Sequence, residues 1–194
     1  GSNTVGQLGD GSTNESLSPV LVSGGLTFTA ISAGAKHVCG VADSRAYCWG
    51  ANDAGQLGPF DSDNRLTPRQ VTNTLSFASI SAGDSHTCAL TSAGAAYCWG
   101  ANSSGQMGDG STTARSSPTA VSGGLVFRMM ESSIAYNCGL TTDSLAYCWG
   151  SSSSGLGTGS TQNLAPAAVT GGHLYLTLAT GGDFTCGITK EGAG

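Results

Sequence analysis

The chain has 194 residues, of which 39% are hydrophobic, only 10% are charged and 31 are glycine, and its net charge is −5. Its seven cationic residues stand singly at Lys36, Arg45, Arg65, Arg69, Arg115, Arg128 and Lys190. Nucleic-acid binding requires clustered cations, and a membrane span requires roughly 20 apolar residues in a row. We therefore expect neither nucleic acid as a partner nor insertion into a membrane.

One short sequence motif, the Tyr-Cys-Trp phrase, recurs at regular intervals along the chain. Ala-Tyr-Cys-Trp-Gly occurs three times, at residues 46–50, 96–100 and 146–150, and a second cysteine precedes each copy by about ten residues. A fixed period of about fifty residues is typical of an array of one supersecondary unit. Such scaffolds present binding surfaces more often than catalytic sites, which favours a binding function.

Each unit is predicted to open with a short buried strand, read first at residues 28–33. It ends at a glycine in three units, Gly34, Gly83 and Gly181, and at Ser133 in the other. Glycine at such a place serves close backbone approach or a positive φ. We expect the third unit to be the least regular. If the φ is positive elsewhere, Ser133 carries local strain of about 1 kcal/mol or shifts the backbone.

Three more strands follow in each unit. The second strand begins at residue 37, and after a turn at residues 43–44 the Tyr-Cys-Trp phrase forms the third. A glycine-punctuated loop at residues 51–58 comes next. The last strand has the pattern Pro-x-x-Val and recurs at residues 19–22, 68–71, 118–121 and 166–169. Proline suits the outer edge of a sheet, where the missing N–H is harmless.

Four short antiparallel strands that recur in this way predict an all-β chain that forms a β-propeller. About four blades are expected, as part of a ring or in an assembled ring, near residues 18–50, 66–100, 117–150 and 165–194, with the last incomplete. A solenoid of the same period is the alternative, although known solenoids lack this placement of Gly and Trp.

The cysteines are expected to pair within hairpins. Pairing the second and third strands sets the cysteines opposite one another as Cys39 with Cys48, Cys88 with Cys98 and Cys138 with Cys148. Opposed residues of an antiparallel pair lie about 4.5–5.5 Å apart at Cα, within disulfide range. Zinc is the rival interpretation, but a hairpin offers only two of four ligands. Disulfides indicate an oxidising compartment, so we expect a secreted or cell-surface protein.

Cys186 aligns with the first cysteine of each pair, but the chain ends before the next Tyr-Cys-Trp phrase. We therefore expect Cys186 to be unpaired or bonded to another chain. The strand near residues 185–189 then lacks a partner, and buried unpaired backbone groups cost about 1–3 kcal/mol each. We expect the gap to be filled by a strand from a neighbouring copy or from residues beyond this sequence.

The segments 80–90 and 96–110, followed by Pro118, resemble the repeat of the regulator of chromosome condensation family across essentially the whole chain. The resemblance implies a seven-bladed propeller closed by strands from both ends, whereas this sequence has about four units. Its paired cysteines look like the bacterial extracellular branch. Nucleotide exchange on a small GTPase and nucleosome binding do not carry over, because no residue here matches those sites. A branch that includes a secreted β-lactamase inhibitor implies protein binding outside cells.

Other candidate residues receive structural interpretations. His37 and His86 occupy a slot that holds Tyr136 and Phe184 in the other units, which indicates core packing. Oxygen-rich turns at residues 9–11, 61–64 and 108–110 lack the full calcium pattern. No Gly-x-Ser-x-Gly elbow occurs. We predict no enzyme activity and no catalytic, cofactor or metal residues.

Trp49, Trp99 and Trp149 are predicted to pack between blades, although a ring of aromatics could instead bind a sugar. The leading hypothesis is a non-catalytic extracellular scaffold for protein–protein interaction, with variable loops on a constant frame. One alternative is a self-assembling subunit completed by strand exchange between copies. A carbohydrate- or cell-wall-binding module is the other.

Overall fold

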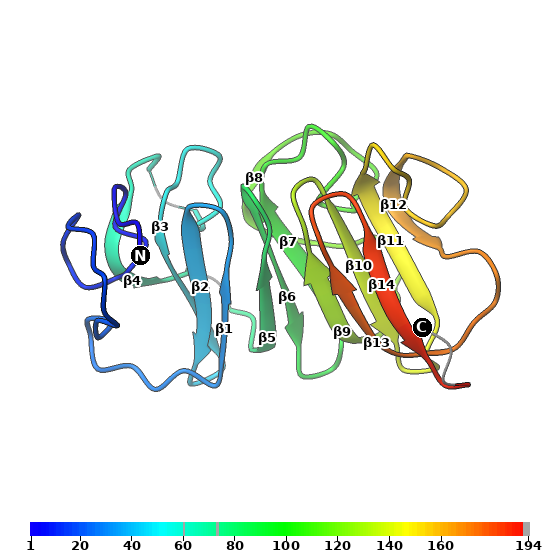
Figure 1. Ribbon diagram of the computed structural model, residues 1–194, viewed down its shortest axis with the longest axis horizontal. Coiled ribbons are helices and arrows are strands. Elements are labelled where there is room, and N and C mark those ends of the chain that lie inside the picture. Colours follow the sequence, from blue (N-terminus) through cyan, green and yellow to red (C-terminus); the bar gives the residue numbers. More distant parts are fainter. Residues whose placement is uncertain (60, 73, 192–194) are drawn as a thin grey trace.

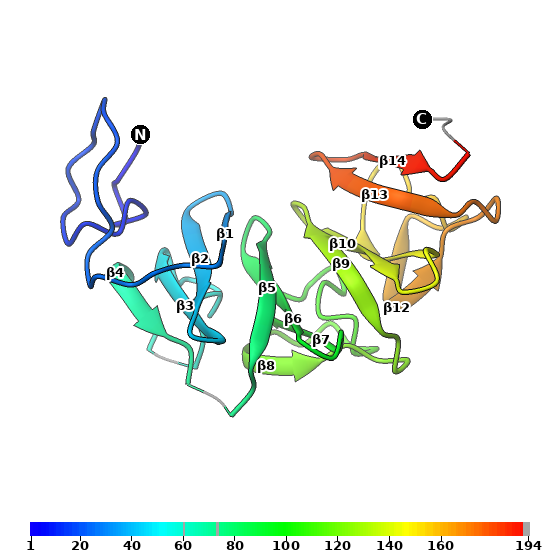
Figure 2. The same ribbon diagram turned by 90° about the horizontal axis from the view of Figure 1, so that it is seen from below.

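The computed structural model describes residues 1–59, 61–72 and 74–191. These residues form fourteen strands and no helix, as the sequence predicts. The strands build three four-stranded antiparallel sheets and one two-stranded sheet. The sheets follow one another around an open arc (Figures 1 and 2), which is the arrangement of blades in a β-propeller.

The sheets follow chain order. The first two consist of β1 (Ala30–Ala33), β2 (His37–Ala42), β3 (Arg45–Gly50) and β4 (Arg65–Gln70), then β5 (Phe77–Ala82), β6 (His86–Thr91), β7 (Ala96–Gly100) and β8 (Arg115–Ala120). The last two consist of β9 (Phe127–Ser132), β10 (Tyr136–Thr141), β11 (Ala146–Ser151) and β12 (Gln162–Ala168), then β13 (Tyr175–Thr180) and β14 (Thr185–Thr189).

Within each full sheet the strands run in order from the inner side of the arc to the outer side (Figure 2). The second strands β2, β6 and β10 are buried along almost their whole length, because both faces of each sheet pack against neighbouring parts of the array. The outer strands β4, β8 and β12 are largely exposed. They contain Pro68, Pro118 and Pro166, at the edge where proline was predicted.

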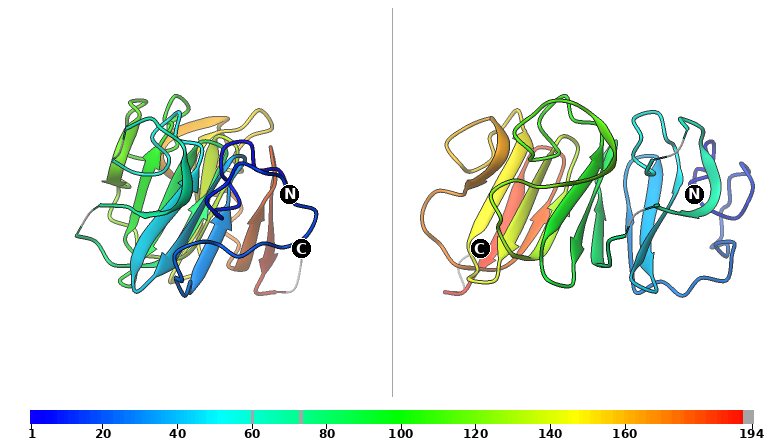
Figure 3. Two further views of the ribbon diagram at one scale, coloured as in Figure 1. Left: turned by 90° about the vertical axis from the view of Figure 1, so that its left-hand side faces the viewer. Right: turned by 180° about the vertical axis from the view of Figure 1, so that it is seen from behind.

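The sheets begin one strand later than the blades predicted near residues 18–50, 66–100 and 117–150. Each proline-containing strand is hydrogen-bonded to the Tyr-Cys-Trp strand that precedes it in the sequence, as β4 is to β3. Residues 19–22 therefore form no strand, because no Tyr-Cys-Trp strand precedes them. They belong to an N-terminal segment that lies against the first sheet, far along the arc from β14 (Figure 3).

The glycine after the first strand is required for close approach and not for a positive φ. A Cβ on Gly83 would lie 2.4 Å from the carbonyl oxygen of Ser133 and 2.3 Å from Cε1 of His86. Neither Gly83 nor Ser133 has a positive φ, so the strain conditionally predicted at Ser133 does not arise. The amides of Gly83 and Ser133 make equivalent hydrogen bonds, each 2.9 Å long, to His86 and Tyr136.

The third sheet is as regular as the second around its disulfide. Glu131 lies opposite Cys138 just as Ser81 lies opposite Cys88. The prediction that the third unit departs from the others is therefore wrong for this part of the sheet. The exchange of serine for glutamate does change the chemistry, because burial raises the pKa of the half-buried Glu131 carboxyl.

Positive φ is required elsewhere, directly after each tryptophan. Gly50, Gly100 and Gly150 have φ values of 99°, 106° and 98°, a region that favours glycine. The pairing with the outer strand shifts register just before each of these glycines, which is the mark of a β-bulge. The extra residues lie in the outer strand, so the tryptophan keeps the alternation of its own strand and faces the same seam as the tyrosine two residues before it.

Three hairpin disulfides join the second and third strands of the full sheets, linking Cys39 to Cys48, Cys88 to Cys98 and Cys138 to Cys148. The Cα atoms of each pair are 4.1 Å apart. Cys186 lies on β14 as an exposed, free cysteine. Its sheet contains β13 and β14 alone among the described strands.

We predict that replacing both Cys88 and Cys98 by alanine lowers the free energy of unfolding by about 2.5–3 kcal/mol. The reason is the loop-closure entropy that the bond removes from the unfolded chain. Chemical denaturation monitored by circular dichroism measures this loss. The Cys186→Ser variant is the matched control and should unfold like the wild type. An unchanged midpoint for the double variant would contradict the prediction.

Candidate functional site

The three tryptophans lie in the seams between successive units. Trp99, on β7 of the second sheet, donates a hydrogen bond from Nε1 to the carbonyl oxygen of Gln56 at 2.8 Å. Gln56 lies in the loop between β3 and β4 of the first sheet. Trp149 donates in the same way to Gln106 at 3.1 Å, and Trp49 to Gln7 at 3.0 Å. The exposed fractions of Trp49, Trp99 and Trp149 are 1%, 0% and 0%. The indole rings are therefore unavailable for stacking on a sugar, which removes the basis of the carbohydrate hypothesis.

A second set of polar groups converges on the same carbonyl oxygens. Thr87 donates from Oγ1 to Gln56 O at 2.9 Å, and its Oγ1 lies 2.9 Å from Nε2 of His37. Because the threonine proton is used on Gln56, His37 must donate from Nε2. A continuous chain of hydrogen bonds thus runs from His37 in the first sheet, through Thr87 in the second sheet, to Gln56 in the loop between β3 and β4.

The next seam repeats this arrangement with different residues. Asn137 donates from Nδ2 to Gln106 O at 2.8 Å, and its Oδ1 lies 2.9 Å from Nε2 of His86. His86 therefore also donates from Nε2. In both histidines the other ring nitrogen, Nδ1, is buried and makes no hydrogen bond. His37 and His86 are thus packing residues that stay neutral.

Burial controls the protonation of these histidines. Desolvation lowers the pKa of His37 to about 3, and electrostatic repulsion from the neighbouring His86 lowers the pKa in the same direction. Desolvation likewise lowers the pKa of His86, opposed by its hydrogen bond to Asn137 and by the charge of Asp84. A protonated ring would need a second acceptor at Nδ1, and the core provides none.

The loop that supplies each glutamine carbonyl is fixed by an asparagine. Oδ1 of Asn52 accepts a hydrogen bond from the amide of Leu57 at 3.0 Å, and Oδ1 of Asn102 accepts one from Met107 at 2.8 Å. These two asparagines were not among the predicted residues, although the recurring Asn-x-x-Gly-Gln pattern indicates them. In the third unit Ser152 replaces the asparagine and the glutamine is missing.

Turns between the first and second strands of the four sheets lie at the same end of the strands, and we call them the turn rim (residues 34–36, 83–85, 133–135 and 181–184). They surround a shallow hollow of about 240 Å³. The exposed residues at equivalent places differ sharply in chemistry, with Ala35 in the first turn, Asp84 in the second and Ile134 in the third, and Lys36 is exposed next to Ala35. A constant frame therefore carries a variable surface here.

The oxygen-rich loops near the same end are occupied by internal bonds. Asp10 accepts a hydrogen bond from the amide of Ser12 at 2.9 Å, which lowers the pKa of its carboxyl. Asp109 accepts from Ser111 in the same way, and Asp61 is paired with Arg65. Within residues 1–59, 61–72 and 74–191, no three His, Cys, Asp or Glu side chains cluster as metal ligands. In the same residues no helix has the length and apolar character to cross a membrane.

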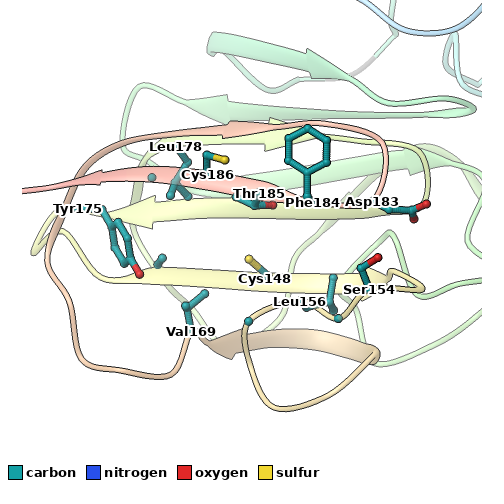
Figure 4. Close-up of a pocket in the computed structure, with 14 residues that line it drawn as sticks. Cys148, Ser154, Leu156, Val169, Tyr175, Leu178, Asp183, Phe184, Thr185 and Cys186 are labelled. Carbon is teal, nitrogen blue, oxygen red and sulfur yellow. The ribbon is translucent and has the colours of Figure 1, made fainter. Parts of the chain in front are cut away.

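A second concavity lies between the third sheet and the two-stranded sheet. This pocket has a volume of about 270 Å³, and its apolar lining comes from β11, β13 and the loop around Leu156. Figure 4 shows Leu156 and Val169 on one side of it and Leu178 and Cys186 on the other. The sequence reasoning placed a missing strand here but did not predict a pocket.

Comparison with protein families identifies the repeat. A family profile described as Regulator of chromosome condensation (RCC1) repeat matches residues 1–41, 43–90 and 93–139. A second profile with the same description matches residues 28–56 and 77–106. No curated protein sequence is significantly similar to the chain.

Several solved structures share the fold. Human WBSCR16 is 23% identical with a TM-score of 0.78, over 90% of this chain and 49% of that one. Prp20p from Saccharomyces cerevisiae, described with its binding properties to Gsp1p and histones, is 20% identical with a TM-score of 0.73, over 82% and 43%. The ectodomain of the Physcomitrella patens receptor kinase CR4 is 26% identical with a TM-score of 0.58, over 86% and 39%. The chain spans less than half the length of each.

We predict that the protein loses stability as the pH falls below the histidine range. The unfolded His37 takes up a proton near pH 6.5 and the folded residue only near pH 3, so stability is complete above pH 6.5 and declines below it. Between pH 7 and pH 5 the loss from His37 alone is about 2 kcal/mol. Denaturant titrations at the two pH values measure it.

The control is His37→Phe, which introduces the ring found at the same place in the fourth unit, as Phe184. This variant is less stable above pH 7, because Thr87 loses a hydrogen-bond partner. It should also lose about 2 kcal/mol of the pH dependence. An equal pH dependence in the variant and the wild type would show that His37 is not the titrating group.

Proposed function

Because the chain belongs to the regulator of chromosome condensation (RCC1) repeat family, we propose that it is a non-catalytic β-propeller scaffold that binds another protein outside the cell. The turn rim is the proposed contact surface. The observation that carries the proposal is the contrast between a repeated frame and unlike exposed side chains at equivalent turn positions.

The frame leaves the rim free to vary. Each turn is held by backbone bonds, such as those from Gly34 to His37 and from Ala51 to Lys36, at 2.9 and 2.8 Å. These bonds do not depend on the side chain at the tip of the turn. Surface loops on such a rigid frame commonly carry binding specificity. A cation, an anion and an apolar group side by side suit a mixed protein surface better than a uniform polyanion.

The extracellular setting is supported by the three hairpin disulfides, since such bonds persist mainly in oxidising compartments. The similar Prp20p is described as binding Gsp1p and histones, and the similar CR4 region is a receptor ectodomain. These partners belong to those proteins, and a shared fold does not transfer them. What supports the present proposal is that a propeller of similar fold is described as binding other proteins.

The test compares one rim variant with a variant at the opposite end of the strands. The rim variant carries Lys36→Glu and Ile134→Asp, both at exposed positions. The control carries Ser92→Lys and Thr142→Asp, which are exposed in the hairpin turns at the other end. Each protein is immobilised and crosslinked to extracellular extract of its source, and the bound proteins are identified by mass spectrometry.

We expect at least one partner that the wild type and the control capture equally and that the rim variant captures at least tenfold less. Charge reversal and burial of a new carboxylate at an interface account for a loss of that size. Both variants should retain the circular dichroism spectrum of the wild type. Equal capture by all three proteins would place the binding surface elsewhere and contradict the proposal.

A further inference from the structure

Two of the seams contain a histidine at the end that lies next to the turn rim. His37 and His86 are the first residues of β2 and β6, so each directly follows a rim turn. His37 reaches from the first sheet to Thr87 in the second, and His86 reaches from the second sheet to Asn137 in the third. We call these seams the His37 seam and the His86 seam. In both, a buried imidazole ties two sheets together at the rim end.

The opposite end of each seam is held by backbone groups that do not titrate. In the His37 seam the amide of Phe77 donates to the carbonyl oxygen of Ser44 at 2.9 Å. In the His86 seam the amide of Phe127 donates to the carbonyl oxygen of Gly94 at 2.8 Å. Ser44 and Gly94 lie in the hairpin turns, at the end of the strands away from the rim. Each seam thus has a titratable contact at the rim end and a contact independent of pH at the other end.

The histidine contact accommodates only the neutral ring. Nε2 already donates across the seam, so a second proton can be added only at Nδ1, and both Nδ1 atoms are buried without a partner. A Cβ on Gly34 would lie 2.8 Å from Nδ1 of His37, and a Cβ on Gly83 would lie 2.7 Å from Nδ1 of His86. The rim glycines therefore pack directly against the edge of the ring where a new proton would need an acceptor.

The charged groups around the rings do not remove this conflict. Burial is the largest effect that disfavours a charge on His37, and His86 adds to it. Burial is also the largest effect at His86, where Asn137 and Asp84 act in the opposite direction. Lys36, which precedes His37 in the first rim turn, is itself a cation and offers no compensation.

We propose that the His37 seam and the His86 seam are acid-sensitive hinges, which open at the rim end when the histidine is protonated and stay joined at the other end. Opening brings Nδ1 into contact with water, which the closed seam excludes. The sheets on either side move as units, because a disulfide joins the second and third strands of each. Local opening of this kind costs less free energy than unfolding of the whole chain.

The seam between the third sheet and the two-stranded sheet provides a contrast within the same chain. Tyr136 stands there in place of the histidine. Its hydroxyl donates to the carbonyl oxygen of Phe184 at 2.6 Å and accepts from Thr185 at 3.1 Å. Histidine is the side chain whose charge ordinarily changes near pH 6, so Tyr136 gives this seam no such response. The hinge property therefore comes from the residue at this position and not from the fold.

The hinges give the turn rim a form of regulation. Opening the His37 seam moves the turn at residues 34–36 away from the turn at residues 83–85, so the surface that the two turns form together is lost. This consequence rests on the proposed function, in which the rim is the contact surface. A partner bound near pH 7 is then released near pH 5.

Hydrogen exchange of the free protein, resolved by residue with NMR, tests the hinges. The amide of Ala82 donates across the His37 seam to Oγ of Ser32 at 3.0 Å, and the amide of Ser132 donates across the His86 seam to Oγ of Ser81 at 2.8 Å. These two amides report on the rim ends, and those of Phe77 and Phe127 report on the opposite ends. Protection factors, which correct each rate for the intrinsic effect of pH, are compared at pH 7 and pH 5.

We expect the protection factor of Ala82 to fall about 25-fold between pH 7 and pH 5, because His37 has a pKa of about 3 in the closed seam and of 6.5 in the open one. Ser132 should also lose protection, whereas Phe77 and Phe127 should keep theirs. Unchanged protection at Ala82 and Ser132 would overturn the proposal. Equal losses at the two ends of a seam would do so too, because the sheets would then separate completely.

Two matched variants separate the seams. In His37→Phe the pH dependence should disappear at Ala82 and remain at Ser132, and in His86→Phe it should disappear at Ser132 and remain at Ala82. A variant that removes the dependence at both amides, or at neither, would show that the histidines do not act on separate hinges. If one variant does not fold, the other still compares the two seams. No partner takes part in these measurements, so they decide the hinge proposal whether or not the proposed function holds.

Discussion

The structure depends on one hydrogen bond that recurs at each seam, from a tryptophan indole to a carbonyl oxygen of the preceding loop. A buried indole N–H without an acceptor costs about 1–3 kcal/mol, so the largest side chain of the unit can be buried only where this carbonyl stands. The bond therefore fixes both how deep the tryptophan lies and which loop it contacts. It joins each sheet to the unit before it.

The other regular features support this contact. The alternation of its strand directs Trp99 toward the preceding sheet, and Asn52 shapes the loop so that Gln56 presents its carbonyl. The disulfide behind the tryptophan holds the second and third strands in one register. Neutral His37 completes the bonds of Thr87 across the seam. Since these groups belong to neighbouring units, stability rises with the number of seams that are filled, as in other repeat arrays.

The turn rim and the pocket beside β14 differ in their relation to the seams. At the base of the turn rim Gly34 and Gly83 pack across the seams, whereas the exposed tips, such as Lys36 and Ile134, can vary without cost to the frame. The pocket beside β14 is part of the series of seams and has kept their chemistry in Leu156, Val169 and Leu178. The rim is therefore suited to a partner unrelated to the repeat.

The sequence by itself determined the repeat, the four strands of each unit, their order and the three cysteine pairs. The reason is that strand alternation and hairpin register depend on residues close together in the sequence, and the same pattern recurs three times. It also indicated that Cys186 stands at the position of the first cysteine of each pair. Tertiary structure alone decided that the proline strand belongs to the preceding sheet, because that pairing joins segments on either side of a long loop. It likewise decided that Gly83 is needed for contact with Ser133 and that Leu156 and Tyr175 line an apolar pocket. These features arise between units, where residues distant in sequence meet, and no local pattern specifies such distances.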